Sequence, residues 1–186
     1  MSSRFSMRDL VADDSATLLR WRNLPDVRSY MYTDVPIQAA EHERWFAGIA
    51  GDDTRRYWVI QLDGEDVGLV NLYGISKQHK RCYWAFYLAS PSVRGKGVGA
   101  AVEHFILNNV FERQHFAKLC CEVLETNEAV VSMHKGFGFV QEGLFRSHVE
   151  RSDGRHNVVS LSMLRGEWVR EKPRIEARLR EKGVLK

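Results

Sequence analysis

Residues 92–100 read Ser-Val-Arg-Gly-Lys-Gly-Val-Gly-Ala, and this glycine-rich turn decides the fold. It follows an apolar run, Cys82 to Leu88, and it opens a segment with Val102 and Ile106 on one helical face. Glycines permit backbone conformations in which successive N–H groups converge, and the N-terminus of a helix carries partial positive charge. The turn is therefore predicted to join a strand to a helix and to bind a phosphate group.

The residues around the turn narrow the type of phosphate ligand. No Gly-Lys-Ser/Thr ends the stretch, so it is not a Walker A loop. Gly95, Gly97 and Ala100 formally meet a dinucleotide pattern, but that fold begins with this strand and needs several more strand-helix-strand units. Here an antiparallel meander precedes the turn and only about 85 residues follow it, which disfavours a dinucleotide site.

Apolar periodicity and turn residues predict the elements on both sides of the turn. Before it we expect helices over Ala16–Arg22 and Gln38–Ala50, a short turn or helix over Pro25–Tyr30, and strands over Arg4–Leu10, Tyr57–Leu62, Asp66–Ile75 and Cys82–Leu88. After it we expect a helix, a charged closing helix, and further elements over Lys118–Leu124 (strand), Glu128–Lys135 (helix), Val149–Arg151 and Val158–Leu164 (strands). This order predicts an α/β fold with a mixed antiparallel and parallel sheet flanked by helices.

Length and composition limit the class of protein. The chain has 186 residues, of which 44% are apolar and 27% charged, so we expect a single domain over residues 1–186. The longest apolar run, Tyr83 to Ala89, is too short to cross a bilayer, and the N-terminus lacks a secretory signal, so a cytoplasmic location is expected. The three cysteines form no C-x-x-C pair, which predicts buried thiols and no metal site: Cys82, Cys120 and Cys121.

Positive charge is concentrated in residues 165–186. This segment holds eight Lys or Arg and four Glu, a net charge of +4, while the whole chain carries +3. Alternating Arg and Glu on a helix is more typical of a solvated face than of a nucleic-acid-binding surface. We therefore expect a basic helical extension at 165–186, and neither a nucleic acid nor a membrane as partner.

The glycine-rich turn and a second motif resemble the GNAT superfamily of acyltransferases. Arg94-x-x-Gly97-x-Gly99 is similar to the superfamily's acetyl-CoA pyrophosphate motif, R/Q-x-x-G-x-G/A. Downstream, residues 122–127 lead into a helix that ends Lys-Gly-Phe-Gly-Phe at residues 135–139, which resembles the family's strand, Asn, helix and Gly-Phe ending. The resemblance covers residues 4–164 and implies the GNAT fold, in which the strands over 82–88 and 118–124 splay apart.

This resemblance implies acetyl-CoA as the cofactor and assigns residues to it. The pantetheine arm would lie between the splayed strands, where a backbone N–H polarises the thioester carbonyl, and the pyrophosphate would bind the N–H groups of the turn. The implied cofactor-binding residues are Tyr87, Leu88, Ala89, Arg94, Gly95, Lys96, Gly97, Val98, Gly99, Asn127 and Lys135. The resemblance also allows a homodimer, because GNAT folds often pair through sheet ends or C-terminal elements.

The family's chemistry implies a proton donor and a proton acceptor near the splayed strands. Many members place a Tyr seven residues after the Asn to protonate the departing thiolate, and here that position holds His134. An imidazole suits such a proton transfer, and a structural histidine is the alternative. Glu122 on the second strand is the candidate base and His42 a further one, each with a structural role as the alternative.

Aromatic and basic side chains gather in the N-terminal third, where the superfamily builds acceptor specificity. Rings stack on a base or sugar and arginine clamps a diphosphate, although Trp45 and Phe46 also fit a helix core. Candidate acceptor-binding residues are Trp21, Arg22, Asn23, Met31, Tyr32, His42 and Trp45.

The same N-terminal pattern predicts an acceptor class. It is similar to the branch that acetylates the 4-amino group of UDP-4-amino-4,6-dideoxy-N-acetyl-β-L-altrosamine, a nucleotide sugar, in pseudaminic acid biosynthesis for flagellin glycosylation. Related Trp-Arg-Asn openings, present here at residues 21–23, also occur in enzymes that acetylate ribosomal-protein N-termini. A CoA-binding module without turnover is the third alternative.

Overall fold

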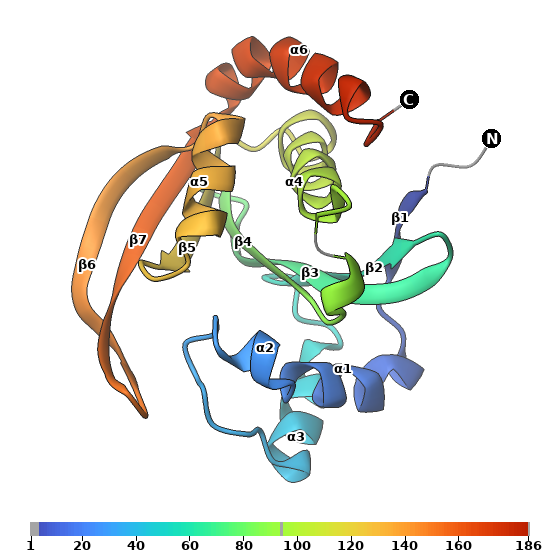
Figure 1. The fold of residues 1–186 in the computed structure, drawn as a ribbon, viewed down its shortest axis with the longest axis vertical. Coiled ribbons are helices and arrows are strands. Elements are labelled where there is room, and N and C mark those ends of the chain that lie inside the picture. Colours follow the sequence, from blue (N-terminus) through green and yellow to red (C-terminus); the bar gives the residue numbers. More distant parts are fainter. Residues whose placement is uncertain (1–3, 94, 186) are drawn as a thin grey trace.

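The computed structural model describes residues 4–93 and 95–185, and within them lies a seven-stranded sheet of order β1-β2-β3-β4-β5-β7-β6 (Figure 1). Its strands are β1 (Phe5–Asp9), β2 (Arg56–Leu62), β3 (Glu65–Ser76), β4 (Arg81–Leu88), β5 (Lys118–Leu124), β6 (Val140–Arg151) and β7 (Gly154–Leu164). Only β4 and β5 pair in parallel among these strands; the other neighbours are antiparallel. The predicted mixed sheet is confirmed.

Helices cover both faces of the sheet. One face carries α1 (Ser15–Arg22), α2 (Pro25–Arg28) and α3 (Ala39–Ile49), and the other carries α4 (Val98–Asn108), α5 (Glu128–Phe137) and α6 (Arg165–Glu181) (Figure 1). Short helical turns lie at Ala12–Asp14, at Pro91–Val93 and, as a π-helical continuation of α4, at Asn109–Arg113.

The apolar side chains divide between two cores because neighbours along a strand point to opposite faces. In β2, Trp58 and Ile60 join the large core under α4, α5 and α6, while Tyr57 and Val59 join a smaller core under α1 and α3. The basic helix α6 is anchored by three buried side chains of the large core: Trp168, Ile175 and Leu179.

The parallel pair of strands is short, and this opens the sheet. Three residue pairs join β4 to β5, the last being Tyr83 with Cys120. Beyond it the two strands diverge, and we call this opening the wedge. On β4, Trp84 and Phe86 face the large core, whereas Tyr87 packs on the opposite side. The splayed strand pair is therefore confirmed.

Residues with positive φ mark two turns beside the sheet. Asp63 and Gly64, between β2 and β3, have φ of 52° and 88°, which a tight two-residue hairpin turn requires. Gly138, with φ of 97°, ends α5 in the left-handed conformation.

The β6–β7 hairpin is longer than the sequence predicts. β6 begins at Val140 and not at Val149, and β7 begins at Gly154 and not at Val158. Two register shifts interrupt the pairing of these strands, and most side chains of β6 are exposed. Each shift breaks the apolar-polar alternation by which a strand is recognised, so the predicted extents are wrong.

Cys82, Cys120 and Cys121 are buried and unpaired, as expected. Burial raises the pKa of the Cys82 thiol to about 12, so it remains protonated. Among the described residues, no helix is long and apolar enough to span a membrane, and no cluster of His, Cys, Asp or Glu is arranged to hold a metal ion.

We predict that Gly68→Ala disturbs the end of β4. A Cβ at Gly68 would lie 2.2 Å from the Tyr87 carbonyl oxygen, which is backbone and has little room to move. The substitution should lower the free energy of unfolding by about 1–3 kcal/mol and weaken acetyl-CoA binding, measured by denaturant unfolding and calorimetry. Gly48→Ala in α3, where no atom lies within 4 Å of the new methyl group, is the matched control. Equal losses in both variants would contradict the prediction.

Candidate active site

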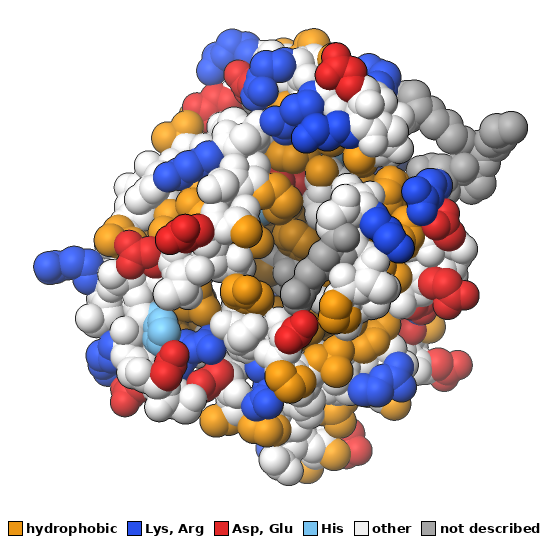
Figure 2. Space-filling model, viewed as in Figure 1, with side chains coloured by type: hydrophobic (Ala, Val, Ile, Leu, Met, Phe, Trp, Pro, Cys, Tyr) orange, Lys and Arg blue, Asp and Glu red, His pale blue; other side chains and the backbone are white. Residues whose placement is uncertain are grey.

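The wedge leaves one backbone edge of β4 free. Trp84 to Leu88 pair with β3 along their other edge, Ala89 N–H donates to the Val67 carbonyl (2.8 Å), and no described residue of β5 pairs with Trp84–Leu88. The surface is hollowed between α4 and α5, and hydrophobic side chains surround the hollow (Figure 2). Free backbone groups beside an apolar groove fit the amides and alkyl chain of a pantetheine arm, as expected for Tyr87, Leu88 and Ala89.

The glycine-rich turn gives α4 an open N-terminus. Gly95 and Gly97 have φ of 75° and 80°, a left-handed conformation that favours glycine. No side chain caps α4 at Gly97, so the first N–H groups of the helix are left for a ligand. Lys96 is exposed and adds a full positive charge. These features fit a pyrophosphate; the predicted contact from Arg94 lies outside the described residues.

The glycine-rich turn packs closely against two other segments of the chain. A Cβ on Gly97 would lie 2.5 Å from Cγ2 of Val184, which follows α6, and a Cβ on Gly99 would lie 3.3 Å from Sδ of Met133 on α5. Val98 between these glycines is buried, so only its backbone is available to a ligand. The turn is therefore packed against α5 and the segment after α6.

The two cofactor-binding candidates around α5 differ in their surroundings. Asn127 precedes α5, and its side chain forms no hydrogen bond with a described residue, which leaves its amide for the cofactor. Lys135 donates from Nζ to Oε1 of Gln141 on β6 (2.9 Å). Because β6 and α4 lie on opposite sides of α5 in Figure 1, the Lys135 ammonium is held away from the glycine-rich turn.

His134 lies in the large core against the wedge. Its side chain is 3% exposed, and Nδ1 lies 2.9 Å from Oε1 of Glu103 on α4, which is fully buried. The imidazole ring contacts Trp84, the first residue beyond the last β4–β5 pair, at 5.2 Å between ring centroids. Glu103 was not among the predicted site residues, because no residue near it in the sequence indicates its buried partner His134.

Electrostatics make Glu103 an unusual carboxyl. Burial raises its pKa, while the positive charges of His134 and Arg178 on α6 oppose the rise. Its second oxygen, Oε2, has no hydrogen-bond partner among the described residues. Glu103 and His134 therefore form one buried, hydrogen-bonded pair.

Glu122 lies on the opposite face of β5. Its Oε2 accepts a hydrogen bond from the Tyr32 hydroxyl (2.7 Å), which arrives on the loop between α2 and α3. Burial and the Glu122 charge raise the pKa of Tyr32 above its ordinary value, so the hydroxyl remains the donor. Tyr73 on β3 also feels the Glu122 charge, after burial as the main cause of its raised pKa. Two predicted site residues are thus brought together.

Other predicted acceptor residues hold the N-terminal helices together instead. Trp21 is 8% exposed and packs in the smaller core, so its ring offers no surface to an acceptor. Asn23 exchanges two hydrogen bonds with the backbone of Ile37 (2.8 and 2.9 Å). His42, 4% exposed, donates from Nε2 to the Ser15 carbonyl (2.9 Å), so its ring joins α3 to α1.

The prediction that Trp45 binds the acceptor is only partly supported by its surroundings. It is half-buried against the smaller core and its ring contacts Tyr57 edge-on at 5.7 Å, which favours the helix-core alternative.

Three arginines surround the loop that carries Met31 and Tyr32. Arg22 is half-buried and forms no hydrogen bond or ion pair with a described residue; burial lowers its pKa. Arg28 donates to the Asp34 carbonyl (2.7 Å). Each arginine keeps one buried guanidinium nitrogen without a hydrogen-bond partner among the described residues: Arg22 Nη1, Arg28 Nε and Arg151 Nε. Arg28 and Arg151 were not among the predicted site residues.

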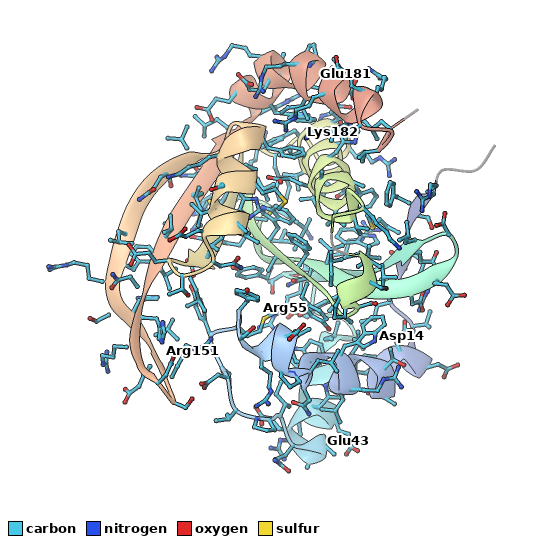
Figure 3. The ribbon with its side chains drawn as sticks, in the orientation of Figure 1. Asp14, Glu43, Arg55, Arg151, Glu181 and Lys182 are labelled. Carbon is cyan, nitrogen blue, oxygen red and sulfur yellow. The ribbon has the colours of Figure 1, made fainter. Side chains whose placement is uncertain are left out.

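The β6–β7 hairpin braces this loop. Arg151 Nη1 donates to the Met31 carbonyl, and Figure 3 shows Arg151 between the hairpin and the loop. The Ser152 N–H and hydroxyl both donate to Oδ2 of Asp34, the former at 3.1 Å. The acceptor side is therefore built from two segments more than 100 residues apart.

Two surface depressions lie elsewhere. One, of about 250 Å³, lies between β1, α4 and the segment after α6, and the other, of about 310 Å³, lies between β1 and α3. Neither includes a predicted site residue, so the wedge remains the candidate active site.

The family follows from a comparison with known proteins. The acetyltransferase (GNAT) domain model matches residues 4–140, which is more than half of the chain. The chain belongs to the GNAT acetyltransferase family. This GNAT protein is an N-acetyltransferase with acetyl-CoA as its acetyl donor, and the wedge, the glycine-rich turn and α5 occupy the positions that the family resemblance predicts.

Relatives of this GNAT enzyme are distant. Acetyltransferase PseH of Campylobacter jejuni (strain 81-176) is 25% identical over 127 residues, which cover 68% of this chain and 77% of PseH. Spermidine N(1)-acetyltransferase of Escherichia coli K12 is 25% identical over 120 residues, 64% of each protein. The structure of spermidine N-acetyltransferase from Vibrio cholerae with CoA and spermine shares the fold, with a TM-score of 0.83 at 21% identity, covering 90% of this chain and 99% of that one. Because the sequence identities to PseH and to the E. coli enzyme are equal, they do not indicate which acceptor this enzyme uses.

We predict that Gly97→Ala weakens acetyl-CoA binding. The substitution strains a residue with φ of 80° and drives a methyl group into Val184, so the N–H groups of the turn shift. The dissociation constant for acetyl-CoA, measured by calorimetry, should rise about tenfold or more. Gly166→Ala in α6, with no atom within 4 Å of the added Cβ, should bind as the wild type does. Wild-type affinity in Gly97→Ala would exclude the turn from the cofactor site.

Proposed function

We propose that this enzyme acetylates the 4-amino group of a UDP-4-amino-4,6-dideoxy sugar, in pseudaminic acid biosynthesis for flagellin glycosylation. The N-terminal sequence pattern supports this acceptor, and the 25% identity to acetyltransferase PseH is compatible with it. The observation that carries the proposal is the unpaired guanidinium group of Arg22 on the acceptor side of the wedge.

A buried guanidinium without a partner calls for an anion. Leaving an N–H unpaired away from water costs free energy, and a phosphate or carboxylate relieves that cost through charge-assisted hydrogen bonds. Arg22 lies close enough to Arg28 for the two charges to repel, and burial is the main cause of its lowered pKa. A diphosphate placed between such groups would neutralise them together.

The same cluster disfavours a polyamine. Spermidine is a polycation at neutral pH, so Arg22 and Arg28 would repel it; Arg151 is offset by its ion pair with Asp153 (3.8 Å). We therefore prefer the nucleotide sugar to spermidine, although the sequence identities to the two kinds of relative are equal.

We assign the proton transfers to two residues on opposite faces of the wedge. Acetyl-CoA supplies the activated acetyl group when bound. Glu122, oriented by Tyr32, accepts a proton from the acceptor ammonium, which frees the nitrogen lone pair. His134 provides the proton that the departing thiolate requires.

The remaining expectations are also proposals. We propose one domain over residues 1–186, because α6 contributes to the same core as α4, together with a cytoplasmic location and a homodimer. Acetylation of a ribosomal-protein N-terminus and a CoA-binding module without turnover are the alternatives that the acceptor assay must exclude.

Thiol release from acetyl-CoA tests the proposal. A UDP-4-amino-4,6-dideoxy sugar, spermidine and an N-terminal ribosomal peptide serve as parallel acceptors. Release with the sugar and a rise in melting temperature with UDP alone are expected. Thiol release only with spermidine or only with the peptide overturns the proposed nucleotide-sugar acceptor. If no thiol is released with any of the three acceptors, the proposed acetyl transfer is overturned.

Arg22→Ala should raise the KM for the nucleotide sugar by roughly 10–100-fold, because one charge-assisted hydrogen bond contributes about 1.5–3 kcal/mol. The dissociation constant for acetyl-CoA should stay unchanged. Arg20→Ala, an exposed position on the same helix, is the control. If KM for the sugar is the same in both variants, Arg22 does not bind the diphosphate.

Glu122→Gln should lower kcat about 10²-fold, since an amide cannot accept the proton of the acceptor ammonium. Steady-state kinetics with the nucleotide sugar measure the loss. Glu142→Gln removes a carboxylate that pairs with Lys118 on the neighbouring part of the sheet, and it should keep wild-type turnover. Equal turnover in the two variants would remove Glu122 from the mechanism.

A further inference from the structure

The buried pair of Glu103 and His134 has a geometry that a structural histidine does not need. We propose that Glu103 is the positioning residue of the acid: it fixes the orientation of His134, so that the pair donates a proton from Nε2 as one unit. The inference rests on the proposed role of His134 in transfer. Glu103 itself touches neither the cofactor nor the acceptor, so it acts only through His134.

The hydrogen bond selects which nitrogen is free. Glu103 Oε1 engages Nδ1 at 2.9 Å, and Nε2 forms no hydrogen bond with a described residue. A carboxyl group held at Nδ1 fixes the ring and leaves the transferable proton at Nε2. Both side chains are buried, 3% and 0% exposed, so the bond is not weakened by water.

The pair is located where the proton is needed. The His134 ring packs on Trp84, immediately past the last paired residues of β4 and β5, so it lies at the apex of the wedge. Glu103 is on α4, the helix that begins at the glycine-rich turn. One rigid helix therefore links the predicted pyrophosphate site to the residue that orients the acid.

Two titratable groups from other elements face the pair. Titratable groups that face it from other elements are Arg178 on α6 and Cys121 on β5. Burial raises the pKa of both Glu103 and Cys121, so the thiol is neutral and Arg178 is the fixed charge. A carboxylate with an imidazolium and a carboxylic acid with an imidazole hold the same number of protons.

With this pair, every proton of the acetyl transfer is accounted for. Acetyl transfer breaks the C–S bond and forms a C–N bond. The acceptor ammonium loses two protons: one passes to Glu122 before the attack, and the second passes from the nitrogen of the tetrahedral adduct to water. The sulfur gains one proton from His134 Nε2. Proton exchange with water then resets both groups.

The chain supplies a matched control. His104, next to Glu103 on α4, pairs with Glu176 on α6 at 3.0 Å, and these side chains are 14% and 20% exposed. This second pair lies beside the depression between β1 and α4, away from the wedge. Glu176→Gln therefore removes a carboxylate from a histidine on the same helix without touching the proposed acid.

Glu103→Gln is the test. It should lower kcat about tenfold or more while the KM for acetyl-CoA stays constant, and it should move the alkaline limb of the kcat profile to lower pH. The sign follows because a carboxylate stabilises the imidazolium and an amide does not, so the acidic form is lost sooner as pH rises. Glu176→Gln should leave both readouts at the wild-type values.

A spectroscopic readout makes the test independent of any acceptor. Ring ¹⁵N resonances of His134 in the protein without acetyl-CoA should titrate at lower pH in Glu103→Gln, and not in Glu176→Gln. Glu103→Asp keeps a carboxylate and should retain the wild-type alkaline limb; it replaces Glu103→Gln if that variant does not fold. The inference is overturned if the His134 resonances of Glu103→Gln titrate as in the wild type. It is also overturned if the alkaline limb of Glu103→Asp shifts to lower pH. If none of the tested amines is acetylated, the proposed function is overturned instead. The His134 titration still tests the role of Glu103 in that case.

Discussion

The early end of the β4–β5 ladder is the constraint on which the rest of this structure depends. A sheet interior normally pairs every backbone group, yet after Tyr83 and Cys120 the two strands separate. The separation costs hydrogen bonds, which the unpaired edge of β4 can recover from water or from a ligand. The surface is hollowed between α4 and α5 (Figure 2), and the loop after α2 approaches β5 through the hydrogen bond from Tyr32 to Glu122. Substrates therefore have two separate entrances to one opening.

Strand alternation then sorts the chemistry by face. On β5, Cys121 points toward Glu103 and the large core, while Glu122 points toward Tyr32. The proposed acid and base are therefore separated by the thickness of one strand and cannot exchange a proton directly. Arg22 Nη1 on α1 and Arg28 Nε on α2, buried nitrogens without a hydrogen-bond partner among the described residues, lie on the proposed acceptor side.

Local patterns predicted most of the fold, and contacts distant in sequence limited the site. The glycine-rich turn and β5 depend on neighbouring residues, so their positions were predicted correctly. β6 was predicted only over its last residues, Val149–Arg151, because its pairing shifts register, which no single-strand pattern records. His42 resembled an acceptor residue because its partner, Ser15, is 27 positions away. Glu103 was missed because its partner is also distant in sequence: only His134, from a later helix, explains a carboxylate in the core.

The brace between the β6–β7 hairpin and the loop after α2 has a consequence for transplanting specificity. Arg151 and Ser152 hold the loop through Met31 and Asp34, and both lie beyond the segment that the family model matches. A chimera that exchanges only the N-terminal helices would keep a hairpin shaped for the original loop. The conformation of this loop thus depends on two separate segments that must be exchanged together, and a library confined to either one would sample loops without their support.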